Sequence, residues 1–221
     1  MNVLIVGASR GLGLEFVRQY LAAGAKVTAT ARDEASLAAL RELGTTALAL
    51  DVANAESASR LAWQIDGAAF DLVVLCAGVY GPKSQGLTPP TESEFDTVMR
   101  TNVLGPMRVI PQLADALAPG AKLAVISSRM GSIGSRGSPN GWLYRASKAA
   151  VNSVLVDASL ALAGKAICVA FHPGWVRTDM GGAGADLAPA QSVSDLRRVI
   201  AGLSQADNGR FLNHDGSAIV W

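Results

Sequence analysis

The stretch that decides the fold lies at the start of the chain: Val3-Leu4-Ile5-Val6-Gly7-Ala8-Ser9-Arg10-Gly11-Leu12-Gly13. Its first four residues form a continuous apolar run, which is typical of a strand covered on both faces. Glycines follow at G-x-x-x-G-x-G spacing, and a helical pattern of apolar residues runs from Leu12 to Ala23. A strand, a glycine turn and a helix in this order predict the first unit of a parallel α/β sheet.

The glycine turn also has a chemical interpretation. Glycines let the backbone turn tightly, and they let a diphosphate approach the N–H groups and positive dipole end of a helix. The spacing differs from the common G-x-G-x-x-G fingerprint. The alternative is a glycine turn with only a packing role, but the strand before it and the helix after it favour a dinucleotide site.

The same alternation of strands and helices continues to the end of the chain. Further strands are predicted at 26–30, 47–50, 72–76, 122–127, 166–171 and 210–213, and helices at 35–43, 55–65, 92–117, 144–163 and 192–203. Pro106 and Pro111 should bend or break the helix at 92–117. No linker interrupts the pattern, so we predict one doubly wound α/β domain over residues 1–221, with functional residues just after the strands.

Composition agrees with a compact enzyme and narrows the partners. Half of the 221 residues are hydrophobic and 17% are charged. The formal net charge of +1 gives no electrostatic reason to expect nucleic acid or an anionic membrane as a partner. The apolar stretch from Val151 to Ala163 contains Asp157 and is too short to span a bilayer. No targeting segment precedes Val3, so a cytoplasmic location is the expectation.

Two arginines bear on the choice of cofactor. Arg32 falls just after the second predicted strand, about 20 residues beyond the glycine turn, where an acidic residue would bind a ribose hydroxyl and an arginine suits a 2′-phosphate. Together with Arg10, it favours NADP(H) over NAD(H). Asp33 adjoins Arg32 and could instead be the ribose ligand. Asp51 and Val52 follow the third strand, where an adenine could rest, although a loop aspartate near a helix start is an equal alternative.

Tyr144 and Lys148 are the candidates for proton transfer. They lie four residues apart in a predicted helix, so their side chains share one face. A nearby cation favours phenolate over phenol, which could let Tyr144 exchange protons near neutral pH. Such a pair also occurs by chance on helix surfaces, and the surrounding residues must decide between the two interpretations.

With these residues in place, the chain resembles the short-chain dehydrogenase/reductase family almost from end to end. The resemblance implies a three-layer Rossmann fold with a mostly parallel seven-stranded sheet in the order 3-2-1-4-5-6-7. It implies a catalytic set of Asn102, Ser128, Tyr144 and Lys148. It implies cofactor contacts from the loops after the strands and from the catalytic pair: Gly7, Ser9, Arg10, Gly11, Leu12, Gly13, Arg32, Asp51, Val52, Ala77, Gly78, Tyr144, Lys148, Pro173, Gly174, Val176 and Thr178.

The implied reaction is hydride transfer between a nicotinamide and a carbonyl compound or its alcohol. Tyr144 would exchange the proton, and Ser128 would orient the carbonyl oxygen. Lys148 would bind the nicotinamide ribose and lower the Tyr144 pKa, and Asn102 would hold a water that relays protons to Lys148. No metal is required.

A narrower part of the family is also similar. Ser127–Ile133, Tyr144–Lys148 and Phe211–Gly216 resemble a group that includes the C-factor signalling proteins and the sniffer carbonyl reductases. The similarity of these three segments keeps a second hypothesis open: the chain could be a dinucleotide-binding signalling or regulatory protein with incidental catalysis. The chain departs from the family after the fourth strand, where Leu75-Cys76-Ala77-Gly78 lacks two usual asparagines. A longer interval before Tyr144 leaves Ser127 as the alternative catalytic serine.

Other residues have open or structural interpretations. Cys76 and Cys168 fall in strands that the implied order separates by a third, about 10 Å apart and too far for a disulfide. His172 and His214 are expected to have no catalytic role. An outer face of the helix at 144–163 could contact a second copy in a homodimer. Five residues in loops at the active edge either form an apolar substrate pocket or pack the loops: Tyr80, Met130, Trp142, Trp175 and Met180.

Overall fold

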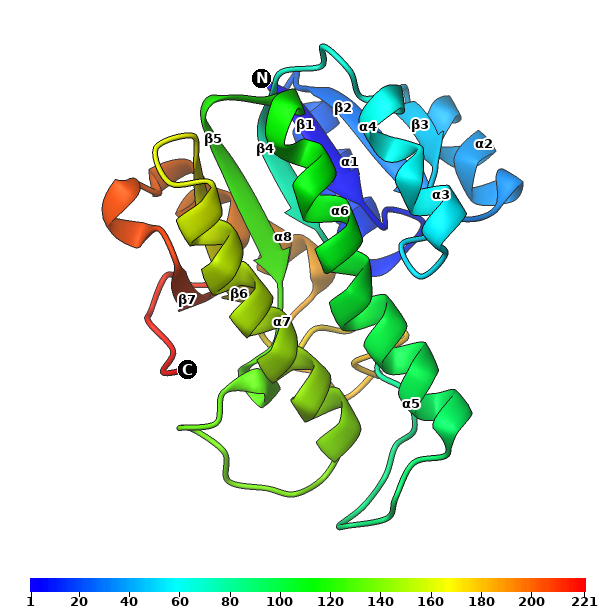
Figure 1. Cartoon of the computed structure of the whole chain (residues 1–221), viewed down its shortest axis with the longest axis vertical. Helices are drawn as coiled ribbons and strands as arrows, with labels where there is room; N and C mark the ends of the chain where they lie inside the picture. The colour runs from blue at the N-terminus through cyan, green and yellow to red at the C-terminus, as the bar shows by residue number, and fades with distance from the viewer.

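Seven strands form one sheet at the centre of the molecule. The computed structural model describes residues 1–221 (Figure 1). The sheet has the order β3-β2-β1-β4-β5-β6-β7, as the sequence predicts. Every neighbouring pair is parallel, so the predicted parallel sheet is confirmed and has no antiparallel strand. The strands are β1 (Asn2–Val6), β2 (Lys26–Ala31), β3 (Thr46–Ala49), β4 (Phe70–Leu75), β5 (Leu117–Ile126), β6 (Ala166–His172) and β7 (Arg210–Asn213).

Helices cover both faces of this sheet (Figure 1). One layer holds α1 (Gly11–Ala22), α2 (Glu34–Glu42) and α8 (Pro189–Gly202). The other layer holds α3 (Ala55–Ser59), α4 (Leu61–Gln64), α5 (Glu92–Met99), α6 (Gly105–Leu113) and α7 (Trp142–Ala161). None of these helices is both long and apolar enough to cross a membrane.

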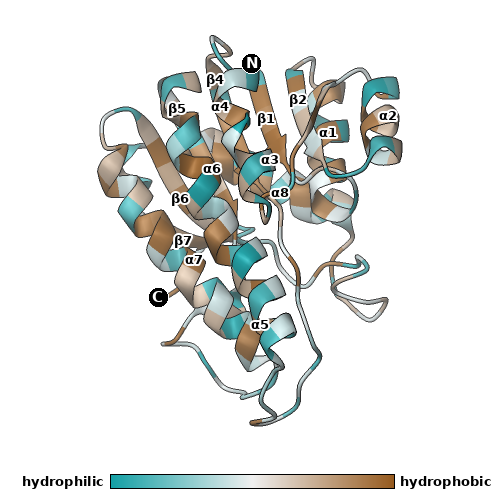
Figure 2. Ribbon diagram, turned by 45° about the vertical axis from the view of Figure 1, so that its right-hand side comes forward, coloured by the Kyte–Doolittle hydropathy of each residue, from teal (hydrophilic) through white to brown (hydrophobic).

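Two hydrophobic cores result, because side chains along each strand point alternately to the two faces. In β1, Leu4 and Val6 pack in a cluster of 28 buried residues with α3, α4, α6 and α7. Val3 and Ile5 pack in the other cluster, of 23 buried residues, with α1, α2 and α8. In Figure 2 the strands are largely brown while the helices alternate between brown and teal, as expected when only one side of each helix is buried.

The predicted helix at 55–65 is two helices, because a side chain from a distant part of the chain interrupts it. Gln112 of α6 accepts a hydrogen bond from Ala62 N (3.1 Å) and donates one to Ala58 O (2.7 Å). Ala62 N and Ala58 O are the two groups that a continuous helix would join. The inserted amide replaces that bond, and the chain makes a turn at Arg60.

The predicted helix at 92–117 is also interrupted. After α5 the chain forms the π-helical turn η1 (Arg100–Leu104), in which Gly105 N bonds to Arg100 O. Pro106 starts α6, because its ring suits the first turn of a helix. The chain is already in β5 at Leu117, five residues before the predicted start. α7 and α8 also begin earlier than predicted, at Trp142 and Pro189.

Candidate active site

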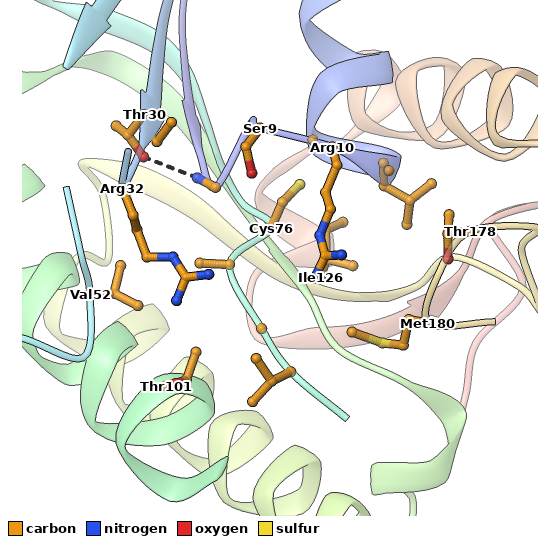
Figure 3. A pocket seen from close by; sticks show the side chains of 18 of the residues that line it. Ser9, Arg10, Thr30, Arg32, Val52, Cys76, Thr101, Ile126, Thr178 and Met180 are labelled. Carbon is orange, nitrogen blue, oxygen red and sulfur yellow. Dashed lines mark hydrogen bonds between the residues drawn. The ribbon is translucent and has the colours of Figure 1, made fainter. Parts of the chain in front are cut away.

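A cleft lies across the carboxyl ends of the strands, where the order of the sheet reverses between β1 and β4. Residues from the ends of the first six strands and the loops that follow them line it (Figure 3). These residues include most of the predicted cofactor contacts: Gly7, Ser9, Arg10, Gly11, Leu12, Gly13, Arg32, Asp51, Val52, Ala77, Gly78, Tyr144, Lys148, Pro173 and Thr178.

In the glycine turn, parts of the backbone lie so close together that only glycine fits. Gly7 has φ +85°, and a Cβ on Gly13 would overlap the carbonyl oxygen of Gly7. Thr30 of β2 fixes the turn, since its Oγ1 accepts from Gly7 N (3.0 Å) and its carbonyl accepts from Ala8 N (2.8 Å). No side chain caps the start of α1 at Arg10, so the first N–H groups of that helix are available to an anion.

The two predicted phosphate ligands lie in different parts of the cleft. In Figure 3 Arg32 lies on the side of Val52 and Thr101, whereas Arg10 lies on the side of Thr178 and Met180. Arg10 Nη1 forms an ion pair with Asp179 Oδ2 at 2.9 Å. Both side chains of this pair are largely exposed, so the pair is weak and leaves Arg10 able to take another anion.

The two aspartates near Arg32 differ in what they bind. Asp33 caps α2, accepting from Ser36 N (2.8 Å) and Ser36 Oγ (2.9 Å), and these bonds lower its pKa. It does not line the cleft, which disfavours its interpretation as a ribose ligand. Asp51 lines the cleft and accepts from Ala53 N at 3.0 Å. It does not cap the next helix, because Asn54 does so.

Lys148 projects from α7 into the buried end of the cleft. Its Nζ donates to the carbonyl oxygen of Ile126 at the end of β5 (2.9 Å) and lies 5.6 Å from the centroid of the Tyr144 ring. Removal from water lowers the pKa of Lys148 to about 8. The ammonium is therefore still mostly protonated at neutral pH.

Tyr144 has a raised pKa, contrary to the expectation that Lys148 lowers it. Burial of the phenol is the largest cause, a hydrogen bond with Ser128 acts in the opposite direction, and the neighbouring Tyr80 raises the pKa further. The charge of Lys148, whose ammonium bonds to the Ile126 carbonyl 5.6 Å from the Tyr144 ring centroid, does not outweigh the effect of burial. In this geometry the phenol of Tyr144 is held in its neutral form.

The two neighbouring serines have different partners. Ser127 donates to Asn152 Oδ1 at 2.5 Å, which directs its hydroxyl toward α7. Ser128 lies beside Tyr144 and lowers its pKa, and the Ser128 Oγ accepts from Met130 N at 3.1 Å. Ser128 is therefore the serine whose hydroxyl shares a site with the Tyr144 phenol, although it is Ser127 that lines the cleft.

Asn102 lies in the π-helical turn η1 and is buried. Its Oδ1 accepts from Val79 N and its Nδ2 donates to Val79 O, both at 2.8 Å, and Nδ2 also donates to Ser147 Oγ at 2.9 Å. Asn102 thus holds the segment after β4, where the usual asparagines are absent. The Pro106 nitrogen carries no hydrogen and cannot bond to the Asn102 carbonyl four residues earlier.

Some predicted residues lie outside the cleft, and others were missed. Gly174 and Val176 do not line it. A Cβ on Gly174 would overlap Leu187, and Val176 pairs with the same leucine, so both residues shape the loop. The prediction missed several lining residues at or just after strand ends, although that position is a signal: Thr30, Ala31, Leu50, Cys76, Val79 and Ile126. It also missed Thr101, in the π-helical turn η1, and Asp179, in the loop after β6.

The candidate pocket residues divide into two groups. Tyr80 stacks on Tyr144 with ring centroids 4.6 Å apart, and Met180 Sδ lies 4.0 Å from the Tyr144 hydroxyl. Trp175 instead donates to Gly181 O (2.9 Å) and Trp142 to Thr88 O (3.0 Å), so each holds a loop.

The remaining candidates are the two cysteines and the two histidines. Cys76 and Cys168 are free thiols on β4 and β6 or just after them, with β5 between. No group of three or more His, Cys, Asp or Glu side chains is placed to hold a metal ion. His214 pairs with Asp195 at 3.2 Å, and His172 is largely buried, with a pKa lowered to about 4.

Comparison with known proteins identifies the family to which this site belongs. The family model described as short chain dehydrogenase matches residues 1–186, which include the glycine turn, Tyr144 and Lys148. The chain belongs to the short-chain dehydrogenase/reductase family. It is therefore an oxidoreductase by family, with its cleft at the position that this fold uses for a dinucleotide.

Among curated short-chain dehydrogenase relatives, 1-hydroxy-2-glutathionyl-2-methyl-3-butene dehydrogenase of Rhodococcus is 33% identical over 231 aligned residues, covering 100% of this chain and 99% of the relative. The C-signal protein of Myxococcus xanthus is 40% identical over 123 residues, which are 54% of this chain and 74% of that protein.

Solved structures of the family are similar over the whole chain. A short-chain dehydrogenase/reductase of Burkholderia multivorans with bound NADP has a TM-score of 0.90 and 32% identity, covering 100% of this chain and 99% of that one. The carbonyl reductase Sniffer of D. melanogaster has a TM-score of 0.89 and 29% identity at the same coverage.

Proposed function

We propose that this short-chain dehydrogenase/reductase is an NADP(H)-dependent carbonyl reductase. The observation that carries the proposal is the position of Tyr144 and Lys148 in the cleft that starts at the glycine turn, with Ser128 beside Tyr144. The NADP bound to the Burkholderia structure and the activity named for Sniffer support the cofactor and the substrate class.

The residues present fit the dinucleotide. The glycine turn has a tight shape that a side chain on Gly13 would disrupt by overlapping the Gly7 carbonyl, and the uncapped N–H groups of α1 lie next to it. Arg32 and Arg10 are the candidates to bind the 2′-phosphate, Asp51 and Val52 the adenine, and Lys148 the nicotinamide ribose. NAD(H) is the alternative cofactor.

The bound cofactor would supply the hydride to the carbonyl carbon. Ser128 would donate a hydrogen bond to the carbonyl oxygen and orient it. Tyr144, neutral because it is buried, would donate its phenolic proton to the same oxygen as the alcohol forms. The positive charge of Lys148 would stabilise the phenolate that this step leaves behind.

The first test replaces the proton donor. Tyr144→Phe should lower kcat for NADPH oxidation by about 100-fold or more with aldehydes, ketones and quinones, because it removes the donated proton. Tyr20→Phe is the matched control, since Tyr20 packs on Phe16 of α1, in the other layer of helices. Turnover that Tyr144→Phe leaves unchanged, or no turnover of any carbonyl compound by the wild type, would contradict the proposal.

A second candidate function is a dinucleotide-binding signalling or regulatory protein with incidental catalysis. The 40% identity to C-signal over 123 residues favours it. In that case Tyr144→Phe would rescue the phenotype of a deletion strain, whereas Gly13→Val, which blocks the turn, would not. A rescue that requires the Tyr144 hydroxyl would count against this function.

A further inference from the structure

Tyr80 is held rigidly beside the proton donor. On its N-terminal side, both backbone groups of Val79 bond to the buried Asn102 amide at 2.8 Å. On its C-terminal side, Gly81 has φ +78°, and a Cβ there would overlap Val98 of α5. The backbone on both sides of Tyr80 is thereby fixed, so the position of its ring is set by the fold.

The ring of Tyr80 packs in a slot that leaves no room for a larger neighbour. It stacks on the Tyr144 ring at 4.6 Å between centroids with 24° between planes. At its far end, a Cβ on Gly141 would lie 2.5 Å from the Tyr80 hydroxyl and 3.1 Å from Met130 Cε. Gly141 has φ +69° at the start of α7, so the glycine serves both the helix start and this slot.

Two methionine side chains lie near the stacked rings of Tyr80 and Tyr144. Met180 Sδ lies 4.0 Å from that hydroxyl, and Met130 contacts the same slot as Tyr80. The nearest acid along the chain, Asp179, is paired with Arg10 at the glycine turn. Tyr144 and Met180 line the dinucleotide cleft whereas Tyr80 does not, so Tyr80 contacts Tyr144 away from the path of the cofactor.

We propose that Tyr80 is a specificity-determining residue that, with Met180, selects carbonyl compounds whose carbonyl is attached to a flat, uncharged aromatic group. The inference rests on the proposed carbonyl reductase function. A carbonyl oxygen that reaches the Tyr144 hydroxyl places its substituent beside the stacked phenols and the thioether. A flat aromatic ring gains offset stacking and sulfur–ring contacts there, whereas a charged substituent loses hydration without a partner.

Two aldehydes of similar size and different shape test this. Benzaldehyde has a flat aromatic ring, and cyclohexanecarboxaldehyde has a saturated one. We expect the wild type to have the higher kcat/KM for benzaldehyde. Tyr80→Leu should reduce the benzaldehyde to cyclohexanecarboxaldehyde ratio by about 3- to 10-fold, the range expected for a lost aromatic pair. Tyr80→Phe retains the ring and should retain the ratio. Trp63→Leu, an exposed aromatic residue on α4, is the control.

Met180→Leu provides a second variant on an exposed side chain, so the test does not depend on Tyr80→Leu folding. It should lower the ratio by about 2- to 3-fold through the lost sulfur–ring contact. An equal ratio in the wild type, Tyr80→Leu and Met180→Leu would overturn the inference, as would a wild-type preference for the saturated aldehyde. Either result leaves the reductase function in place. That function fails instead if Tyr144→Phe leaves the turnover of both aldehydes unchanged.

Discussion

At the scale of single residues, Lys148 is an ammonium group buried against one backbone carbonyl. Its pKa of about 8 lies below the ordinary value of a lysine in an unfolded chain, about 10.4. Between these two pH values the unfolded state binds more protons than the folded state. The contribution of Lys148 to the free energy of unfolding is therefore lowest at neutral pH, where folding must bury its charge. This contribution increases as the pH rises.

This linkage predicts a pH-dependent difference between the wild type and Lys148→Met. From pH 8 to 10, the free energy of unfolding of the wild type should rise relative to the variant by about 1 kcal/mol per pH unit. Below pH 8 the difference should be constant, because both states of the wild type then carry the proton. Urea denaturation of both proteins at four pH values measures it. If the difference in free energy of unfolding between the two proteins does not change above pH 8, burial does not lower the pKa of Lys148.

Arg32 is the residue on which the cofactor preference depends. Arg32→Ala should raise the Michaelis constant for NADPH by about 10-fold or more, because it removes a charge-assisted bond to the 2′-phosphate. The constant for NADH should change little. Arg41→Ala is a matched control, since Arg41 lies on α2 and pairs with Glu34 outside the cleft. An equal rise in the Michaelis constants for NADPH and NADH would show that Arg32 does not bind the 2′-phosphate.

At the scale of elements, the π-helical turn η1 links the segment after β4 to α7. Asn102 donates to Ser147 Oγ, and Ser147 in turn donates to the carbonyl oxygen of Tyr144 at 2.8 Å. Ser147 is fully buried, one residue before Lys148. A chain of three hydrogen bonds therefore runs from Val79 through Asn102 and Ser147 to the backbone of Tyr144.

Ser147→Ala tests this link. The variant leaves one Asn102 N–H without its acceptor in a buried position, which should lower the free energy of unfolding by about 1–3 kcal/mol. If the link also positions Tyr144, kcat should fall while the cofactor Kd changes little. Ser153→Ala, on the exposed side of the same helix, is the control. Equal stability of Ser147→Ala and Ser153→Ala by urea denaturation would contradict the expected role.

At the scale of the whole molecule, the outer side of α7 is a candidate contact between two copies of the chain. Leu160 is 71% exposed there, and Ala146 and Ser153 add small exposed side chains along the same helix. Small side chains allow a second helix to approach closely, and a symmetric pairing would bury Leu160 in both copies.

We therefore expect a homodimer, with twice the mass of the chain by light scattering coupled to gel filtration. Leu160→Glu should shift the protein to the monomer, because it places like charges across the symmetric contact. Trp63→Glu, on the distant α4, should leave the dimer intact. A wild-type protein that is monomeric at micromolar concentration would contradict this prediction.

How far the sequence predicts the structure depends on the distance over which an interaction acts. The order of strands and helices was predicted because apolar periodicity and glycine turns act locally. The break between α3 and α4 was not predicted, because it depends on a hydrogen bond that Gln112 accepts from Ala62 N, 50 residues away in the sequence. The capping role of Asp33 is local, and its bonds to Ser36 fit a helix start, although the sequence left a ribose contact open.

The sequence by itself determined the family, the parallel sheet and the edge where the cleft lies, because these follow from local patterns and from the rule that parallel strands end on one side. Only the tertiary structure decided how the groups of the cleft interact. It directs the Ser127 hydroxyl to Asn152 and places Ser128 beside Tyr144, and it raises the Tyr144 pKa where the sequence predicted a lower one. Burial and hydrogen-bond direction depend on every element packed around a residue, and no short stretch of sequence contains that information.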